Sequence, residues 1–105
     1  MAYLKQVPAG LHFVGDQKIT LAATTPQSLN STIRAASRKL IITVETANVR
    51  YRWGGGNPNL STGNIIFANS TVEFDGYNGT SLLKFCRATG APIMYVTGLK
   101  YKGDV

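Results

Sequence analysis

The sequence predicts an all-β protein: a compact antiparallel β-sandwich of jelly-roll-like type, with a small β-barrel as the alternative. Stretches that alternate polar and apolar residues recur about every 8–12 residues, with Gly, Pro and Asn turn signals between them, which is typical of sandwiches and barrels. Only 15% of the 105 residues are charged, against about 25% in an average soluble domain. Uncharged Thr, Ser, Asn and Gly must therefore supply the polar surface. The length indicates a single domain over residues 1–105.

The N-terminal part of the chain predicts an arm and a strand. Residues 1–17 are expected to form an irregular N-terminal arm or a first short strand, because one proline and two glycines interrupt them. Residues 18–23 alternate, which places Ile19 and Leu21 on one inward face of a strand.

Residues 29–38 are ambiguous. Their apolar side chains fall at helical spacing, and Asn30 or Ser31 is a possible cap. The segment is short and runs into the β-branched stretch at 40–44, which favours a strand. We therefore expect a loop, or at most one short helical turn, before that strand.

Two strands are predicted next, over residues 39–46 and 48–53, with so little between them that they can also form one long strand with a bulge. The glycine-rich loop at 54–63 is the clearest loop in the chain.

Strict alternation in residues 48–53 separates two kinds of side chain. We expect Tyr51 and Trp53 to be mostly buried, and Arg50 and Arg52 to be mostly exposed. Truncating a buried Trp53 to Ala is then expected to cost roughly 3–5 kcal/mol of stability.

The C-terminal half predicts four more strands. Residues 64–68 and 71–75 form a hairpin around a turn at Asn69 and Ser70. Residues 81–87 favour a strand, with a helix as the alternative, and residues 93–97 form a strand that a basic tail follows. The side chains expected to face inward in the hairpin are Ile65, Phe67, Val72 and Phe74.

Residue types that carry chemistry are scarce. His12 is the one histidine and Cys86 the one cysteine, which is too few for a zinc site with metal-ligand spacing. We expect Cys86 to be a small buried hydrophobe without an internal disulfide. Glu73 and Asp75 lie on one face of a strand, and a solvated face that balances nearby lysines explains them better than catalysis or a metal. The sequence therefore predicts no catalytic residue, no metal, no cofactor and no enzyme activity.

The net charge of +6 and the pI near 9.8 suggest three kinds of partner: nucleic acid, an anionic membrane surface, or an acidic protein surface. The positive charges form no block of five or six. Alternation also puts Tyr51 and Trp53 opposite Arg50 and Arg52, whereas a base-stacking surface needs both kinds on one face. No apolar run is long enough for a signal peptide or a membrane span. Nucleic acid is thus the less favoured partner, and no membrane partner is expected.

Several motifs carry a family resemblance. They are the stretch Thr-Val-Glu-Thr-Ala-Asn-Val-Arg-Tyr-Arg at 43–52, the glycine loop with Pro58, the Phe-Cys-Arg-Ala-Thr-Gly run from Phe85, and the final alternating strand at 93–97. In these motifs, over roughly residues 18–97, the chain resembles small virion structural proteins of tailed bacteriophages. The resemblance implies a compact β-sandwich that decorates the capsid or sits at the head–tail junction or in the tail. It also implies synthesis in the host cytoplasm and a final location in the virion.

We therefore expect a non-enzymatic phage virion structural protein, most specifically a capsid decoration or cement protein. Its expected partners are the major capsid protein or other virion proteins, and it is expected to be a homo-oligomer or lattice-bound. The alternatives are an OB-like protein that binds single-stranded nucleic acid, and a virion-associated sugar-binding module for host attachment with Tyr77 or Trp53 as stacking platform. The residues expected to bind the partner are Tyr3, Leu4, Val7, Arg50 and Arg52. Deletion of residues 1–8 is expected to weaken particle binding and leave the fold intact.

Overall fold

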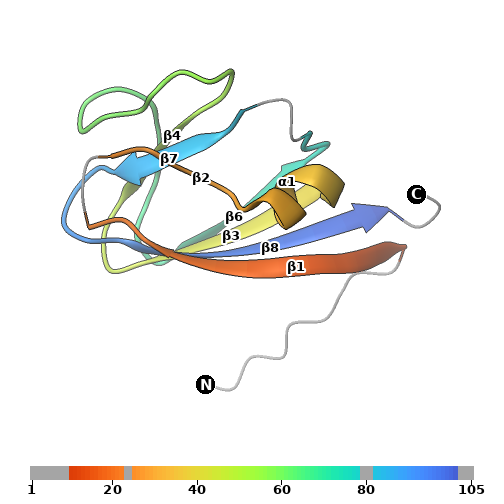
Figure 1. The fold of residues 1–105 in the computed structure, drawn as a ribbon. Coiled ribbons are helices and arrows are strands. Elements are labelled where there is room, and N and C mark those ends of the chain that lie inside the picture. Colours follow the sequence, from red (N-terminus) through yellow and green to blue (C-terminus); the bar gives the residue numbers. More distant parts are fainter. Residues whose placement is uncertain (1–9, 23–24, 79–81, 102–105) are drawn as a thin grey trace.

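The computed structural model describes residues 10–22, 25–78 and 82–101 (Figure 1). These residues form two antiparallel four-stranded sheets that face each other, and one short helix. The predicted all-β sandwich is confirmed, and the two sheets do not close into the alternative barrel. The elements are β1 (Leu11–Thr20), β2 (Gln27–Ser28), α1 (Ser31–Ala36), β3 (Lys39–Glu45), β4 (Val49–Arg52), β5 (Asn64–Ile66), β6 (Ser70–Asp75), β7 (Lys84–Arg87) and β8 (Ile93–Tyr101).

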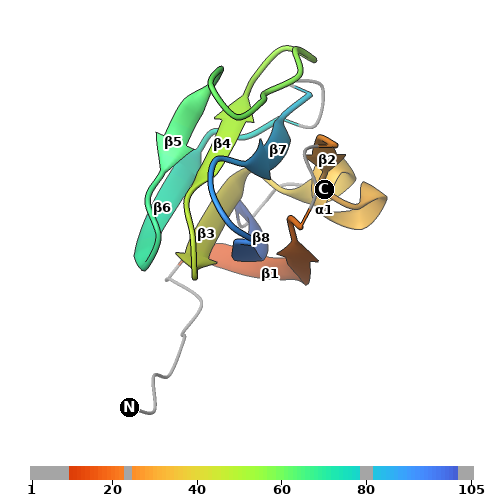
Figure 2. The ribbon, with the colours of Figure 1, turned by 90° about the vertical axis from the view of Figure 1, so that its left-hand side faces the viewer.

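The strand order is that of a jelly roll. Sheet I has the order β1-β8-β3-β6 and sheet II the order β2-β7-β4-β5. The pairs β1–β8, β2–β7, β3–β6 and β4–β5 are the rungs of one long folded hairpin, and rolling that hairpin up places successive rungs in alternate sheets. The edge strands are therefore β1 and β6 in sheet I, and β2 and β5 in sheet II. Figure 2 shows β5 and β6 on the same side of the sandwich.

The core lies between the sheets and follows from alternation. In β3 the residues Leu40, Ile42 and Val44 are fully buried, and the residues between them face outward. They meet Val49 and Phe85 of sheet II, which are equally buried. Burying one such side chain contributes about 1.5–3 kcal/mol, so this inner layer holds the two sheets together.

Helix α1 covers one end of the core. The Asn30 side-chain oxygen accepts from the Ile33 N–H at 2.9 Å, so Asn30 is the N-cap. Ile33 is buried, and the helix packs against β1 and β8. The prediction of Asn30 as a possible cap is confirmed, although the helix holds six residues and is longer than the single turn expected.

Residues 11–17 belong to the ten-residue strand β1. For them the expectation of an irregular arm is wrong, and the alternative of a first strand is confirmed, although the strand is longer than expected. The reason is that β8 extends to Tyr101 and pairs with β1 from Leu11 to Thr20. A β-bulge between Phe13 and Gly15 accommodates the irregular part of the sequence. Residues 1–9, and with them Tyr3, Leu4 and Val7, lie outside the described residues.

One predicted connection is wrong and one alternative does not occur, for a common reason. Strands β3 and β4 lie in different sheets, and so do β5 and β6. The prediction of two separate strands is therefore confirmed over the alternative of one bulged strand, whereas β5 and β6 do not form the predicted hairpin around Asn69 and Ser70. Thr46 and Asn69 both have positive φ, at 80° and 62°, and these sharp turns send the chain from one sheet to the other.

The inward side of β5 differs from the prediction by one residue. Ile66 is 2% exposed, whereas Ile65 and Phe67 are 37% and 64% exposed. Ile66 pairs with the buried Val49, and residues directly opposite each other share a face of the sheet. The inward orientation expected for Val72 and Phe74 is confirmed, because both pack against the core.

Candidate functional site

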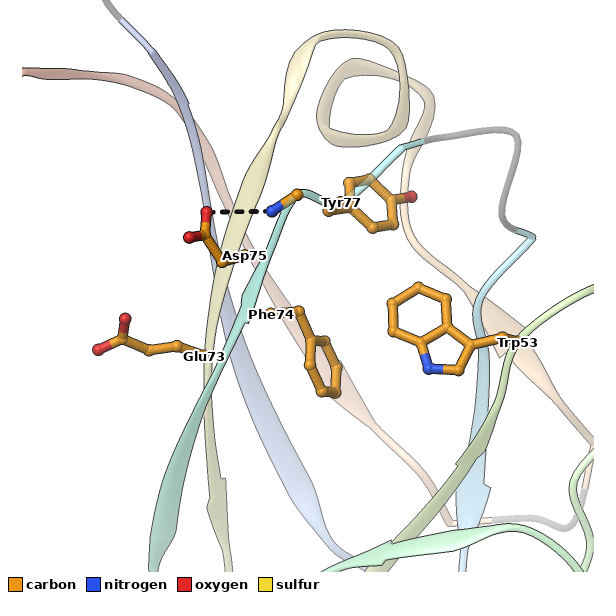
Figure 3. A pocket seen from close by; sticks show the side chains of 6 residues that line it. Trp53, Glu73, Phe74, Asp75 and Tyr77 are labelled. Atoms are coloured by element: carbon orange, nitrogen blue, oxygen red, sulfur yellow. Dashed lines mark hydrogen bonds between the residues drawn. The ribbon is translucent and has the colours of Figure 1, made fainter.

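A groove opens on the β6 side of the sandwich. Its volume is about 440 Å³, and it lies between the end of β6 and the residue that follows β4 (Figure 3). We call it the Trp53 groove. The residues that line it are Trp53, Glu73, Phe74, Asp75, Gly76 and Tyr77.

Aromatic rings form one wall of this groove. The centroid of the Trp53 ring lies 5.2 Å from that of Phe74, with an interplanar angle of 65°, and 6.3 Å from that of Tyr77. The Tyr51 ring meets Trp53 edge-on, at 6.3 Å and 87°. These contacts hold the indole in one orientation, because edge-to-face ring pairs at this spacing are favourable.

The burial expected of Trp53 is wrong, because its side chain is 40% exposed. Strand β4 ends at Arg52, so Trp53 leaves the pleat and lies at the rim of the groove rather than between the sheets. Tyr51 stays in the strand and is half-buried against the core. Truncation of Trp53 is therefore expected to cost less than the 3–5 kcal/mol of a fully buried aromatic residue.

Tyr77 is buried with its ring toward Trp53 (Figure 3). Burial raises the pKa of its phenol, and the charge of Arg34 opposes this shift. The phenol of Tyr77 thus stays neutral at ordinary pH and serves as a wall of the groove.

The carboxylate side chains of Glu73 and Asp75 project from β6 on the side opposite Phe74 (Figure 3). Lys39 Nζ lies 2.8 Å from Glu73 Oε1, and this hydrogen bond raises the pKa of Lys39. Asp75 Oδ1 accepts from the Gly76 N–H at 3.0 Å and from the Tyr101 hydroxyl. The Tyr101 bond is the main cause that lowers the pKa of Asp75. Alternation placed both carboxylates on one face, and the expectation that nearby lysines balance them is confirmed for Glu73 by Lys39. No sequence signal pointed to Tyr101 as the partner of Asp75.

Replacing Tyr101 with Phe is expected to lower the free energy of unfolding at neutral pH, and to do so less at acid pH. The hydrogen bond lowers the pKa of Asp75, so its stabilisation is present above the ordinary carboxyl pKa and is lost as pH falls through the folded value. It also raises the pKa of Tyr101, so the same contribution is lost above about pH 10. Urea denaturation of both proteins at pH 7 and pH 2.5 measures the difference.

Tyr95→Phe is the matched control, because Tyr95 is exposed on the same face of sheet I and its pairing involves no carboxylate. A gap between wild type and Tyr101→Phe that stays constant from pH 7 to pH 2.5 would show that the Asp75 bond contributes nothing.

The outer face of sheet II carries Arg50 and Arg52 of β4 and Lys84 of β7. Arg50 donates from Nε to the Leu60 carbonyl at 3.0 Å and from a terminal nitrogen to the Gly63 carbonyl at 2.7 Å. The loop at 54–63 is thereby fastened over this face.

The exposure expected of the two arginines is confirmed for Arg52 and wrong for Arg50, which is half-buried. The reason is that the loop carbonyls fold back onto the Arg50 guanidinium. Lys84 Nζ also donates to a loop residue, to Asn57 Oδ1 at 3.2 Å. Arg50 thus positions the loop, while Arg52 is exposed and its guanidinium lies beside Gly56 of the loop.

Cys86 lies opposite Arg50 in the neighbouring strand and is fully buried, as predicted. Burial raises the pKa of its thiol, and the charges of Arg50 and Arg87 oppose that shift. The thiol is therefore protonated at neutral pH, and a protonated thiol is a poor nucleophile.

Charge is segregated between the two sheets. Within the residues that the structure describes, every carboxylate lies on the outer face of sheet I, where Lys18 and Lys39 accompany them. The outer face of sheet II holds the basic side chains of Arg50, Arg52 and Lys84. The carboxylates of sheet I are Asp16, Glu45, Glu73 and Asp75.

Other kinds of site were sought in the same part of the chain. The described residues contain no group of three or more His, Cys, Asp or Glu side chains that could hold a metal ion. None of their helices has the length and apolar character needed to cross a membrane. The Trp53 groove and the basic face of sheet II are candidate sites of the described residues, and a smaller hollow of about 270 Å³ lies on sheet I beside Lys18 and Tyr95. In comparisons with known proteins, no protein-family model, no curated protein and no solved structure matches this chain.

Proposed function

We propose that this protein is a non-enzymatic structural component of a phage virion, most specifically a decoration protein that binds the capsid surface. In this proposal the outer face of sheet II docks on the major capsid protein or on another virion protein. The protein would be made in the host cytoplasm and carried in the virion. The observation that supports this most directly is the segregation of charge between the two sheets.

The separation of charge between the two sheets favours one orientation of the molecule toward an acidic partner. Among the described residues, Arg52 and Lys84 lie on a face without carboxylates, whereas Lys18 and Lys39 share their face with four. Complementary charge sets the register of an interface and speeds the encounter more than it raises affinity. An acidic surface would therefore meet sheet II first.

The fold and the sequence motifs support the same conclusion by analogy. Jelly rolls of eight strands occur in viral capsid domains, and also in lectins and cupins. A fold of this kind hosts unrelated functions, so it supports the proposal only together with the charge pattern and the resemblance to virion proteins.

The free sheet edges support a homo-oligomeric or lattice-bound state. Strand β1 is ten residues long and, among the described residues, pairs with β8 alone. An edge of this length offers unpaired backbone groups to a neighbouring strand. Many copies on a lattice would also gain avidity if each copy touched more than one capsid subunit.

The experiment compares Arg52→Glu with Lys18→Glu, which makes the same charge change on the outer face of sheet I. Particles that lack the protein are incubated with each variant, and bound protein is measured by mass spectrometry. Arg52→Glu is expected to weaken binding about tenfold or more, which is roughly 1.4 kcal/mol, and Lys18→Glu is expected to bind as the wild type does. In the same assay, deletion of residues 1–8 tests whether Tyr3, Leu4 and Val7 contribute.

Absence of the wild-type protein from purified particles would overturn the proposal. Equal loss of binding in both charge variants would overturn the assignment to sheet II. If the protein lacking residues 1–8 binds as well as the full chain, the arm makes no contact with the particle.

The nucleic-acid alternative assumed an OB-like barrel, and the two sheets do not form one. The two aromatic residues considered for base stacking also lie apart from the basic side chains, because Trp53 lines the groove and Tyr51 packs against the core. This alternative would be favoured if the wild-type protein bound a labelled single-stranded oligonucleotide and the Arg52→Glu variant did not.

A further inference from the structure

We propose that the Trp53 groove binds a neutral oligosaccharide, with one sugar ring stacked on the Trp53 indole and hydroxyl groups of the same or the next unit hydrogen-bonded along the Glu73–Asp75 edge. This site is separate from the basic face of sheet II and does not depend on the decoration role.

The indole is suited to stacking because it is both exposed and held in place. Trp53 is 40% exposed, and Phe74, Tyr77 and Tyr51 contact its ring. The electron-rich face of an indole attracts the C–H groups on the flat side of a sugar ring. Because neighbouring rings already fix the indole, little side-chain entropy is lost when a ligand binds.

The groove has the size that a small ligand needs. Its volume of about 440 Å³ lies within the range of roughly 300–1,000 Å³ that is usual for small-molecule sites. Gly76 turns the chain directly after β6, and its φ of +75° favours glycine.

The charges along β6 favour a neutral ligand. An anionic sugar would meet the carboxylates of Glu73 and Asp75, whereas a cation would meet the ammonium group of Lys39 that already pairs with Glu73. An ionised carboxylate has about four lone-pair sites, and Asp75 uses one oxygen for Gly76 and Tyr101. The remaining sites can accept hydrogen bonds from hydroxyl groups.

The aromatic rings and the carboxylates of the Trp53 groove lie on opposite sides of β6. Figure 3 shows the rings of Trp53, Phe74 and Tyr77 on one side of β6, and the carboxylates of Glu73 and Asp75 on the other. A ring stacked on Trp53 would direct its hydroxyl groups across the edge of β6. Contact with both walls therefore requires a ligand that extends across the edge of β6.

The chain has a single tryptophan, which gives the test a direct readout because all tryptophan fluorescence comes from Trp53. An array of neutral and sialylated glycans is screened first, and the strongest neutral oligosaccharide is then titrated into the full-length protein. We expect the emission of Trp53 to change with saturation, and Asp75→Asn to weaken binding about fivefold or more. Calorimetry measures the same oligosaccharide with Trp53→Ala, for which a loss of at least tenfold is expected.

Tyr95→Ala is the matched control, because it removes an exposed aromatic residue from the outer face of sheet I. It is expected to bind the glycan as the wild type does, and circular dichroism checks that all variants are folded. The proposal is overturned if no neutral glycan binds, if sialylated glycans bind better, or if Tyr95→Ala loses as much affinity as Trp53→Ala. Particle binding by Trp53→Ala is expected to be unchanged, so the glycan site and the decoration role can fail separately.

Discussion

Replacing Phe85 with Ala is expected to destabilise the protein by about 3–5 kcal/mol, the cost of removing a fully buried aromatic side chain. Phe85 is 0% exposed and is among the largest side chains buried in the core. It faces inward from β7, with its ring centroid 6.4 Å from that of Tyr51. Both sheets pack around the Phe85 side chain, so the cavity that the substitution creates can collapse only in part. Urea denaturation at pH 7 measures the change in the free energy of unfolding.

Phe67→Ala is the matched control, since it makes the same chemical change at a position that is 64% exposed. Exposed substitutions of this kind usually alter stability by about 0.5 kcal/mol or less. Equal losses at Phe67 and Phe85 would show that the core is not where the structure places it.

Replacing Gly98 with Ala is expected to destabilise the protein by about 1–3 kcal/mol or more, the cost of overpacking a tight core. A Cβ at Gly98 would lie 2.1 Å from Ser37 Oγ and 3.2 Å from a side-chain carbon of Ile33. Ser37 is fully buried directly after α1. The Ser37 hydroxyl must therefore turn away, or the helix must shift from β8, to admit even one methyl group. Chemical denaturation of the variant measures the cost.

A second substitution tests this cause. Ser37 Oγ is buried without a hydrogen-bond partner among the described residues, so Ser37→Ala alone is expected to be neutral or stabilising. Because it removes the nearest atom that Gly98→Ala would strike, the double variant is expected to recover at least about 0.5 kcal/mol of the loss. If the two changes are additive, the cost at Gly98 does not come from contact with Ser37.

Local patterns in the sequence were enough to predict the class of fold and several of its parts. The alternation of Leu40, Ile42 and Val44 predicted the inner face of β3, and Asn30 marked the start of the helix. The glycine-rich loop at 54–63 and the buried state of Cys86 were also predicted. Each of these features depends on neighbours within a few residues, because side-chain periodicity and capping are local properties of the backbone.

The tertiary structure alone decided which strands are partners. Pairing with Val49 turned Ile66 inward, and a slip of one residue in such a pairing moves every side chain of the strand to the other face. The ends of β4 and β6 brought Trp53 beside Phe74, and the folded-back loop gave Arg50 its two carbonyl partners. The groove and the basic face both arise from contacts between segments that are distant in the chain, and no local pattern specifies such contacts.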